Sequence, residues 1–247
     1  MPRKHFSTAD MERKSERISD KLIILSCEGV ITEEEYFELL SSEIFFSIGT
    51  KIRILSARGD YLNKEKRTKE EKDFQNRSSP TDVLNRMDDY LSLNHEIKRM
   101  PQDECWLVMD IDDHTSPQKI GEWDSVMNSC KEKGYKVAVS NPFFEFWLYL
   151  HHFDVCEEDH SHCVSEERPY QPDPYFRHIM EENDVGLKQN HKKPLPCHYN
   201  YEKVQQAVQR AKELDDGKEA YPKNTLGSTV YKIIEQFVEL KKRVEGI

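Results

Sequence analysis

Acidic residues stand directly after three apolar segments of this chain. Glu28 and Gly29 follow the run KLIILSC, and Ser140 and Asn141 end or follow the run KVAVS. The run CWLVM passes straight into an Asp-Ile-Asp-Asp sequence at 110–113. If these runs are parallel strands, the residues after them meet at the carboxyl edge of the sheet, where open α/β sheets bind ligands. The acids that this placement would gather are Glu28, Glu33, Asp110, Asp112, Asp113 and Glu145.

Several carboxylates at one place repel each other, and this repulsion indicates what the place could bind. A like-charge pair at about 4 Å costs about 4 kcal/mol at an effective dielectric constant of about 20. Protons or a divalent cation must offset that cost. Oxygen ligands suit Mg²⁺ or Mn²⁺, which screen phosphate charge and activate water. The pattern predicts phosphate-ester chemistry, although acids also occur in first helical turns simply because they favour helix N-termini.

The segments that must position these acids alternate between strands and helices. Short apolar runs predict strands at 21–27, 51–56, 105–112 and 136–140. Helical spacing of apolar residues predicts helices at 33–46, from 79, from 116 to 134, at 142–153, at 201–214 and at 228–243. Asp110 and Asp112 would share one face of the third strand, since they are two residues apart. The alternation predicts an α/β fold whose parallel sheet is covered by helices on both faces.

Residue types at the helix ends give sharper predictions. Thr32 is a good N-cap residue, and Glu35 would complete a capping box with it. Ser79 is an N-cap with Pro80 at the first helical position. Gly134 should end the helix that opens after Ser116.

Length and composition bound the class of protein. The 247 residues suit one domain with a large insertion, which we divide into a flexible arm at 1–20, a core at 21–153, and an insertion with C-terminal helices at 154–247. The net charge of −10 argues against a broad basic coat for DNA. No apolar stretch is long enough to span a bilayer, and the N-terminus lacks the apolar region of a secretion signal. The six cysteines suit free buried thiols, so we expect a cytoplasmic protein that binds no membrane.

Three blocks of sequence stand in order along the chain: CEGVITEEEYF, LVMDIDDH and VAVSNPFFEFWLYLHHF. These blocks resemble the RloB-like family, whose fold is similar to the Toprim domain of topoisomerases, primases and OLD-type nucleases. Glu28, Asp110 and Asp112 match the Toprim pattern of a glutamate after the first strand and an Asp-x-Asp after a later one. The third block matches the family's Ser-Asn-Pro-x-Phe-Glu-x-Trp pattern from Ser140 onwards, and the segment at 224–231 resembles a further family segment.

The resemblance implies a Toprim-like, Mg²⁺- or Mn²⁺-dependent endonuclease that serves as an effector of anti-phage abortive-infection systems. It favours RNA, tRNA included, over DNA as substrate, and an ABC/SMC-type ATPase as partner, since the chain has no Walker A sequence of its own. Glu28 would be a general acid/base or a metal ligand, and one of Lys188, Lys192 and Lys193 would act beside the acids. The implied metal ligands are Glu28, Glu33, Asp110, Asp112, Asp113 and Glu145, with substrate contacts from Ser140, Asn141, Lys192 and Lys193.

A second hypothesis comes from a different class of function. The Toprim-like domain could be a non-catalytic partner module that binds and regulates the ATPase, with the 154–200 segment and the last helices as its interface. The sequence leaves open which hypothesis holds, which signal activates the protein, and whether it forms a homo-oligomer.

Three further features each admit two interpretations. The basic segment at 51–72 is either a loop that binds a nucleic-acid backbone or, more simply, a solvated loop. His151, at the end of an aromatic segment, suits core packing better than metal binding. The cysteines and histidines at 156–163 and 197–198 invite a zinc site but lack a Cys-x-x-Cys pair, so an exposed polar loop is favoured.

Overall fold

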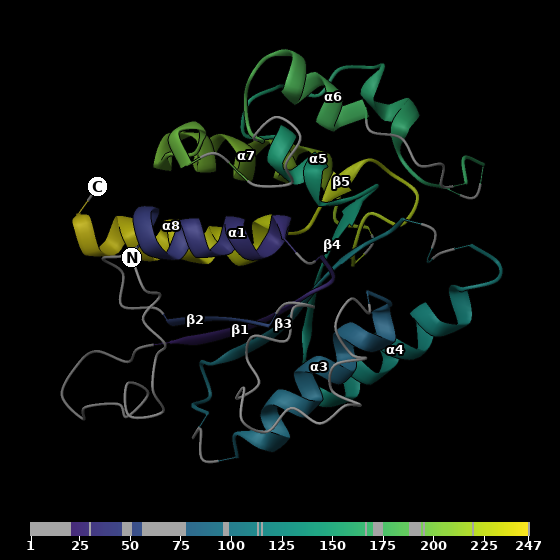
Figure 1. The fold of residues 1–247 in the computed structure, drawn as a ribbon, viewed down its shortest axis with the longest axis vertical. Helices are drawn as coiled ribbons and strands as arrows, with labels where there is room; N and C mark the ends of the chain where they lie inside the picture. The colour runs from purple at the N-terminus through teal and green to yellow at the C-terminus, as the bar shows by residue number, and fades with distance from the viewer. Residues whose placement is uncertain are drawn as a thin grey trace.

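The computed structural model of the chain has a central sheet with helices on both sides (Figure 1). It describes residues 21–29, 31–45, 51–55, 78–95, 99–112, 114, 116–165, 167–169, 175–187, 194, 196–218 and 220–246. The arm at 1–20, most of the basic segment, Asp113 and the three candidate lysines lie outside the described residues.

Four short apolar runs form the parallel sheet that the sequence predicts. They are β1 (Leu22–Cys27), β2 (Lys51–Leu55), β3 (Glu104–Asp110) and β4 (Lys136–Asn141), in the spatial order β2-β1-β3-β4. A fifth, unpredicted strand, β5 (Gly227–Ser228), pairs antiparallel with β4. Cys27 is in register with Val108, and Asp110 with Ser140. The carboxyl ends of β1, β3 and β4 therefore lie along one edge.

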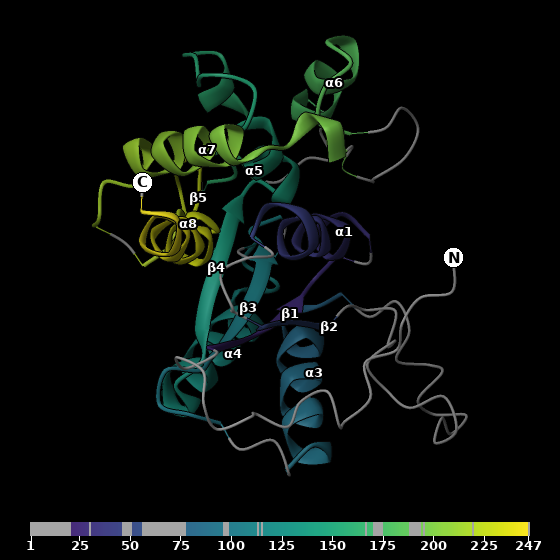
Figure 2. The ribbon, with the colours of Figure 1, turned by 90° about the vertical axis from the view of Figure 1, so that its left-hand side faces the viewer.

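The alternation of side chains along β1 divides the core into two layers. Ile23 and Leu25 belong to one buried cluster, while Leu22 and Ile24 belong to the other. The first cluster includes residues of α1 (Thr32–Leu39), α5 (Phe144–Tyr149), α7 (Tyr201–Leu214) and α8 (Tyr231–Glu245), and the second includes α3 (Pro80–Leu93) and α4 (Ile120–Lys133) (Figure 2). This mostly parallel α/β arrangement is consistent with the predicted Toprim-like fold. The domain boundary at 153 stays a prediction.

Two helix starts differ in how well the capping signals predicted them. The prediction of a capping box at Thr32 and Glu35 is wrong. Thr32 is the first residue of α1, Ile31 is the N-cap residue, and no side chain caps the helix. A neighbouring acid, Glu33, instead turns back toward the loop that leaves β1. Ser79 caps α3 as predicted and accepts the backbone N–H of Asp82.

Several helices are shorter than predicted, because turns occupy their expected ends. Residues 116–119 form a hydrogen-bonded turn, so α4 begins at Ile120, although it ends at Gly134 as predicted. The aromatic segment is helical only at Phe144–Tyr149, after an extended Phe143. α1 gives way to a π-helical turn at Leu40–Ile44, and β5 delays the start of α8 to Tyr231.

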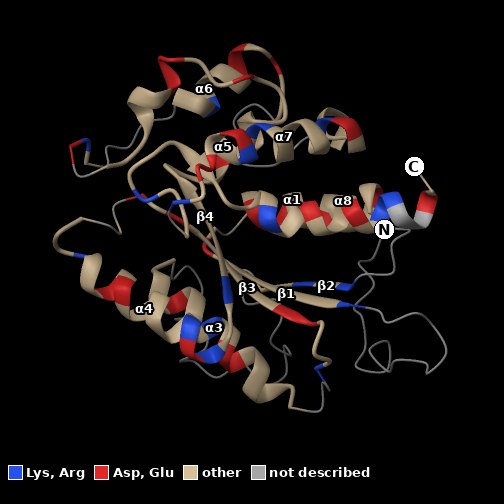
Figure 3. Ribbon diagram, turned by 180° about the vertical axis from the view of Figure 1, so that it is seen from behind, with Lys and Arg blue, Asp and Glu red and all other residues tan. Residues whose placement is uncertain are grey.

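The segment at 154–200 has more regular structure than its composition predicts. It contains α6 (Tyr175–Glu182), which buries Phe176 and Met180 in the first core cluster. Short 3₁₀ turns lie at Asp159–His162 and Pro196–His198. Acidic and basic side chains are interspersed along the described helices (Figure 3). No helix in the described part of the chain is both long and apolar enough to cross a membrane.

Candidate active site

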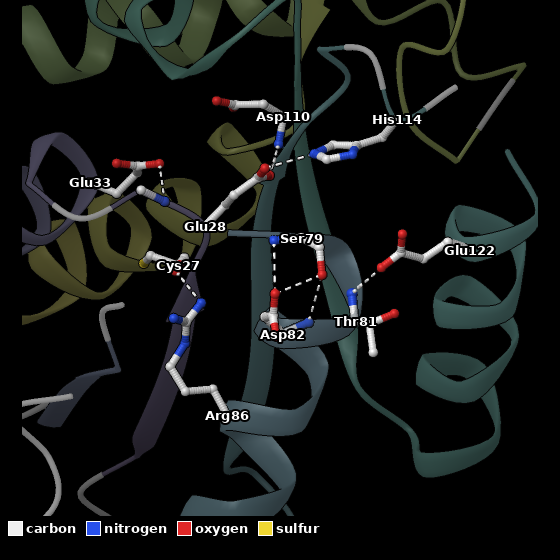
Figure 4. Close-up of polar contacts among 11 residues, drawn as sticks. Cys27, Glu28, Glu33, Ser79, Thr81, Asp82, Arg86, Asp110, His114 and Glu122 are labelled. Carbon is white, nitrogen blue, oxygen red and sulfur yellow. Dashed lines mark hydrogen bonds and ion pairs between the residues drawn. The ribbon is translucent and has the colours of Figure 1, made fainter. Parts of the chain in front are cut away.

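Three neighbouring strands bring four acidic residues to one edge of the sheet. Glu28 follows β1, Asp110 ends β3, and Glu33 and Glu145 lie in the first turns of α1 and α5. The backbone N–H of Asp110 donates to Oε2 of Glu28 at 3.0 Å and so joins the ends of β1 and β3 (Figure 4). Glu28 and Asp110 therefore lie together, as the strand pattern predicts.

Burial and neighbouring carboxylates raise the pKa of two of these acids, Glu33 and Asp110. Burial raises the pKa of Glu33 to about 7, and the carboxylates of Glu145 and Glu28 contribute to the rise. Burial also raises the pKa of Asp110 well above its usual range, with contributions from the carboxylates of Glu28, Glu33, Glu145 and Asp112. Because burial and like charge both disfavour the ionised form, a proton or a cation stabilises this cluster.

Three of the carboxylates are each held by a donor from another part of the fold. Each of these carboxylates therefore already has a partner within the protein. The pairs are Oε1 of Glu28 with Nε2 of His114 at 2.7 Å, Oε1 of Glu33 with the backbone N–H of Gly29 at 2.9 Å, and Oε1 of Glu145 with Nη2 of Arg177 at 2.6 Å.

Gly29 allows the close approach of Glu33 to the loop after β1. A Cβ atom at Gly29 would lie 1.8 Å from Oε2 of Glu33 and 2.3 Å from its Cδ. The absence of a side chain at this position thus determines where the Glu33 carboxylate rests.

His114 is a residue of the site that the sequence analysis did not single out. Its side chain is buried, and its ring stacks on Trp123 with 17° between the ring planes. Its position immediately after the Asp-Ile-Asp-Asp sequence was the only available signal. The contact with Glu28 depends on how the loop after β3 folds back, which the sequence pattern does not specify.

Arg86 supports the site from the opposite layer. Its side chain is 6 % exposed, and Nη2 donates to the backbone carbonyl of Cys27 at 2.9 Å (Figure 4). The hydroxyl of Ser26 donates to the carbonyl of Val83 in the same region. These bonds fix α3 against the last two residues of β1, and so they position the backbone of Glu28, which follows the strand.

The predicted placement of Asp112 on the strand is wrong. β3 ends at Asp110, and Asp112 lies in a turn with a φ of 39°. Its backbone N–H donates to the carbonyl of Pro142, and that of Ile111 donates to Ser140. Asp112 still influences the pKa of Asp110, so the turn keeps it near the cluster.

Ser140 and Asn141 lie beside the cluster, but their side chains make internal contacts. Oγ of Ser140 is 2.9 Å from Oγ of Ser228, and the amide of Asn141 bonds to the backbone of Val164 and Pro222. Both side chains are buried. Their predicted contact with substrate stays a prediction without structural support, and Lys192 and Lys193 lie outside the described residues.

Burial confirms one of the alternative interpretations, whereas the zinc interpretation stays untested. His151 is buried in the core and bonds to the hydroxyl of Tyr36, as the packing interpretation predicts. Cys156 and Cys197 are exposed, whereas Cys163 is buried. Among the described residues, no group of three or more His, Cys, Asp or Glu side chains is arranged to hold a metal ion, and this holds for the zinc candidates as well.

The donor set nevertheless suits a hard divalent cation in type and in place. It consists of carboxylate oxygens, which Mg²⁺ and Mn²⁺ prefer, and burial together with like charge raises the pKa of Glu33 and Asp110 and so disfavours uncompensated negative charge there. The oxygens do not converge because Glu28, Glu33 and Glu145 are each turned toward a protein donor. Such an ion would require Glu145 to exchange its protein donor, Arg177, for the metal.

Comparison with known families places the chain in one of them. The family model described as RloB-like protein matches residues 23–237, which is most of the chain. The chain belongs to the RloB-like family. The region matched in this RloB-like protein includes all the acids of the cluster as well as His114 and Arg177. No curated protein and no solved structure shows a significant match to the chain.

Proposed function

We propose that this RloB-like protein is a divalent-metal-dependent endonuclease that cleaves phosphodiesters at the carboxyl edge of its sheet. The observation that supports the proposal most is the gathering of Glu28, Glu33, Asp110 and Glu145 at this edge, with the pKa of Glu33 and Asp110 raised. Mg²⁺ or Mn²⁺ bound there would screen phosphate charge and lower the pKa of a water molecule.

The contacts of the acidic residues suggest a separate role for each in the proposed reaction. Glu28 is held between the N–H of Asp110 and His114, so its carboxylate has a fixed direction in which to accept a proton from an attacking water or to bind the ion. Asp110 and Asp112 are the main ligands that we assign. Glu33, Asp113 and Glu145 complete the proposed ligand set.

The finer part of the proposal rests on the family resemblance. We infer that the substrate is RNA, tRNA included, in preference to DNA, and that the protein acts in anti-phage abortive infection under the control of an ABC/SMC-type ATPase. Because the chain has no Walker A sequence, any ATP dependence would have to come from a partner.

A cleavage assay with matched variants tests the catalytic part. Purified wild type, Glu28→Gln and Asp110→Asn are incubated with end-labelled RNA and DNA in Mg²⁺, Mn²⁺ or EDTA. We expect cleavage only with metal, and a loss of about 100-fold or more in both variants. Glu132→Gln, an exposed position on α4, is the control and should cleave like the wild type.

One observation favours the non-catalytic partner module as the second candidate. Glu28, Glu33 and Glu145 each already have a protein partner, and this arrangement needs no ion. The two functions differ in cells that express the wild type or Asp110→Asn, each with and without the neighbouring ATPase. New RNA or DNA ends that appear only with the wild type support the nuclease. ATPase binding without any new ends supports the partner module.

A further inference from the structure

Arg177 brings a positive charge to the acidic cluster from a helix that lies 32 residues beyond Glu145 in the sequence. It lies on α6, and its Nη2 contacts Oε1 of Glu145 at 2.6 Å. The Glu145 side chain is 10 % exposed, and that of Arg177 is 32 % exposed. The acid is therefore sealed from solvent, while the guanidinium reaches the surface.

The contact leaves part of the guanidinium group unused. Only Nη2 bonds to Glu145, and the buried Nε has no hydrogen-bond partner among the residues that the structure describes. A guanidinium has five N–H donors in a planar fork that matches phosphate oxygens. The spare donors and partial exposure give Arg177 the capacity to bind a second anion.

The position of Arg177 is fixed by its neighbours on α6. Phe176 and Met180 are fully buried in the first core cluster, and the Phe176 ring packs on Phe146 of α5 with centroids 4.8 Å apart. α6 is thus anchored independently of the ion pair. The guanidinium is held at the acidic edge even when its bond to Glu145 breaks.

We propose that Arg177 is a phosphate-binding residue of this site, which neutralises Glu145 through Nη2 and contacts a phosphate of the nucleic-acid substrate through its spare N–H donors. This inference rests on the proposed nuclease function and adds to it a substrate contact that comes from α6. It also explains why the charge of Glu145 can be tolerated at a buried position before metal binds.

Binding measurements in EDTA separate this role from a structural ion pair, because they do not depend on turnover. The probe is a short fluorescein-labelled single-stranded RNA, with DNA of the same length in parallel, titrated over a range of salt. We expect Arg177→Ala to weaken binding several-fold and to reduce the slope of log K against log salt by about 0.7, the value for one phosphate contact on a single strand. Arg177→Lys should lie between Ala and wild type.

Glu145→Gln should change the affinity for RNA in the opposite direction from Arg177→Ala. Removing the charge of Glu145 frees the guanidinium, so this variant should bind RNA more tightly than the wild type in EDTA. Arg210→Ala is the matched control, since Arg210 makes a similar ion pair with Asp154 instead of with the cluster. Circular dichroism melts verify folding, and Arg177→Gln replaces Arg177→Ala should the latter unfold.

The outcomes separate this inference from the proposed function. Unchanged affinity and salt slope in folded Arg177→Ala, weaker binding in Glu145→Gln, or no binding of either strand by the wild type would each overturn the role of Arg177. The proposed function is decided separately by metal-dependent cleavage in the wild type. Cleavage with an unaltered Arg177→Ala salt slope therefore removes only the inference about Arg177.

Discussion

Oε1 of Glu28 lies 2.7 Å from Nε2 of His114, and both side chains are buried at the carboxyl edge of the sheet. The His114 ring stacks on Trp123, whose Nε1 donates to the hydroxyl of Tyr221. A chain of side chains therefore links the C-terminal segment to the acid that follows β1. The direction of Glu28 is set by residues that are far apart in the sequence.

Substitution of His114 should weaken the site more than the fold. His114→Ala removes the partner of Glu28 but leaves the Asp110 N–H bond, so the carboxylate becomes less well oriented. Loss of such a supporting contact costs about 10–100-fold in metal affinity or activity. The measurement is the Mg²⁺ concentration that gives half-maximal cleavage. His178→Ala, at an exposed histidine paired with Glu182, should leave that concentration unchanged. Equal Mg²⁺ dependence in His114→Ala and the wild type would contradict the prediction.

Gly29→Ala should displace Glu33. The new Cβ would overlap Oε2 of Glu33, which is the end of a flexible side chain, so the carboxylate moves and loses its bond to the Gly29 N–H. We expect a stability loss of about 1 kcal/mol and weaker Mn²⁺ binding, measured by urea denaturation and calorimetry.

Gly121→Ala is the control for a methyl group added elsewhere. Gly121 lies in α4 with nothing within 4 Å of the added Cβ, so the variant should gain up to about 1 kcal/mol from helix propensity and bind Mn²⁺ normally. Mn²⁺ affinity that stays at the wild-type value in Gly29→Ala would show that Glu33 contributes nothing to metal binding.

The sheet and the meeting of Glu28 with Asp110 could be predicted from sequence because they depend on local patterns. Short apolar runs identify buried strands, and parallel topology places their carboxyl ends together. The same reasoning failed for Asp112, because it assumed that the strand continues. Asp tolerates the left-handed backbone region better than most residues, so the chain can turn there.

The partners of the acids could not be predicted in this way. The contacts of His114 and Arg177 depend on how a loop and α6 pack against the sheet edge, and α6 lies in a segment whose composition hides its periodicity. Arg86 did have a signal. It stands three residues after Val83 and four before Tyr90 on the buried stripe of α3, where a charged residue requires a buried partner.

Tyr36→Phe should destabilise the layer of helices that carries the site. Nδ1 of His151 is 3.0 Å from the carbonyl of Trp147 and therefore donates to it, so Nε2 accepts from the hydroxyl of Tyr36 at 3.0 Å. Removing that hydroxyl leaves a buried acceptor without its donor, at a cost of about 1–3 kcal/mol in urea unfolding. Tyr201→Phe, whose hydroxyl is 3.5 Å from the carbonyl of Val238, should cost much less. Equal effects of the two substitutions would contradict the assigned bond.

The stability of the metal-free protein should fall as the pH rises toward neutrality because of Glu33. Its pKa rises from 4.5 to about 7 on folding, chiefly through burial. The folded state therefore keeps a proton that the unfolded chain releases, and stability decreases between these two pH values and levels off above the upper one. The full effect is at most about 3 kcal/mol, since one pKa unit corresponds to about 1.4 kcal/mol.

The difference between the wild type and Glu33→Gln separates this effect from that of groups whose pKa Glu33 does not influence. Burial lowers the pKa of His151 to about 3, so His151 contributes stability at neutral pH that is lost as the pH falls below 6.5, which opposes the trend from Glu33. Because His151 is present in both proteins, its contribution cancels.

Urea unfolding in EDTA should give curves of stability against pH that separate from pH 5 to 7, with Glu33→Gln the more stable at the upper end. Mg²⁺ should raise the stability of the wild type most at neutral pH, where Glu33 is ionised. Curves that stay parallel would mean that folding does not raise the pKa of Glu33, and the unfavourable ionisation from which the metal affinity of the cluster is inferred would then be absent.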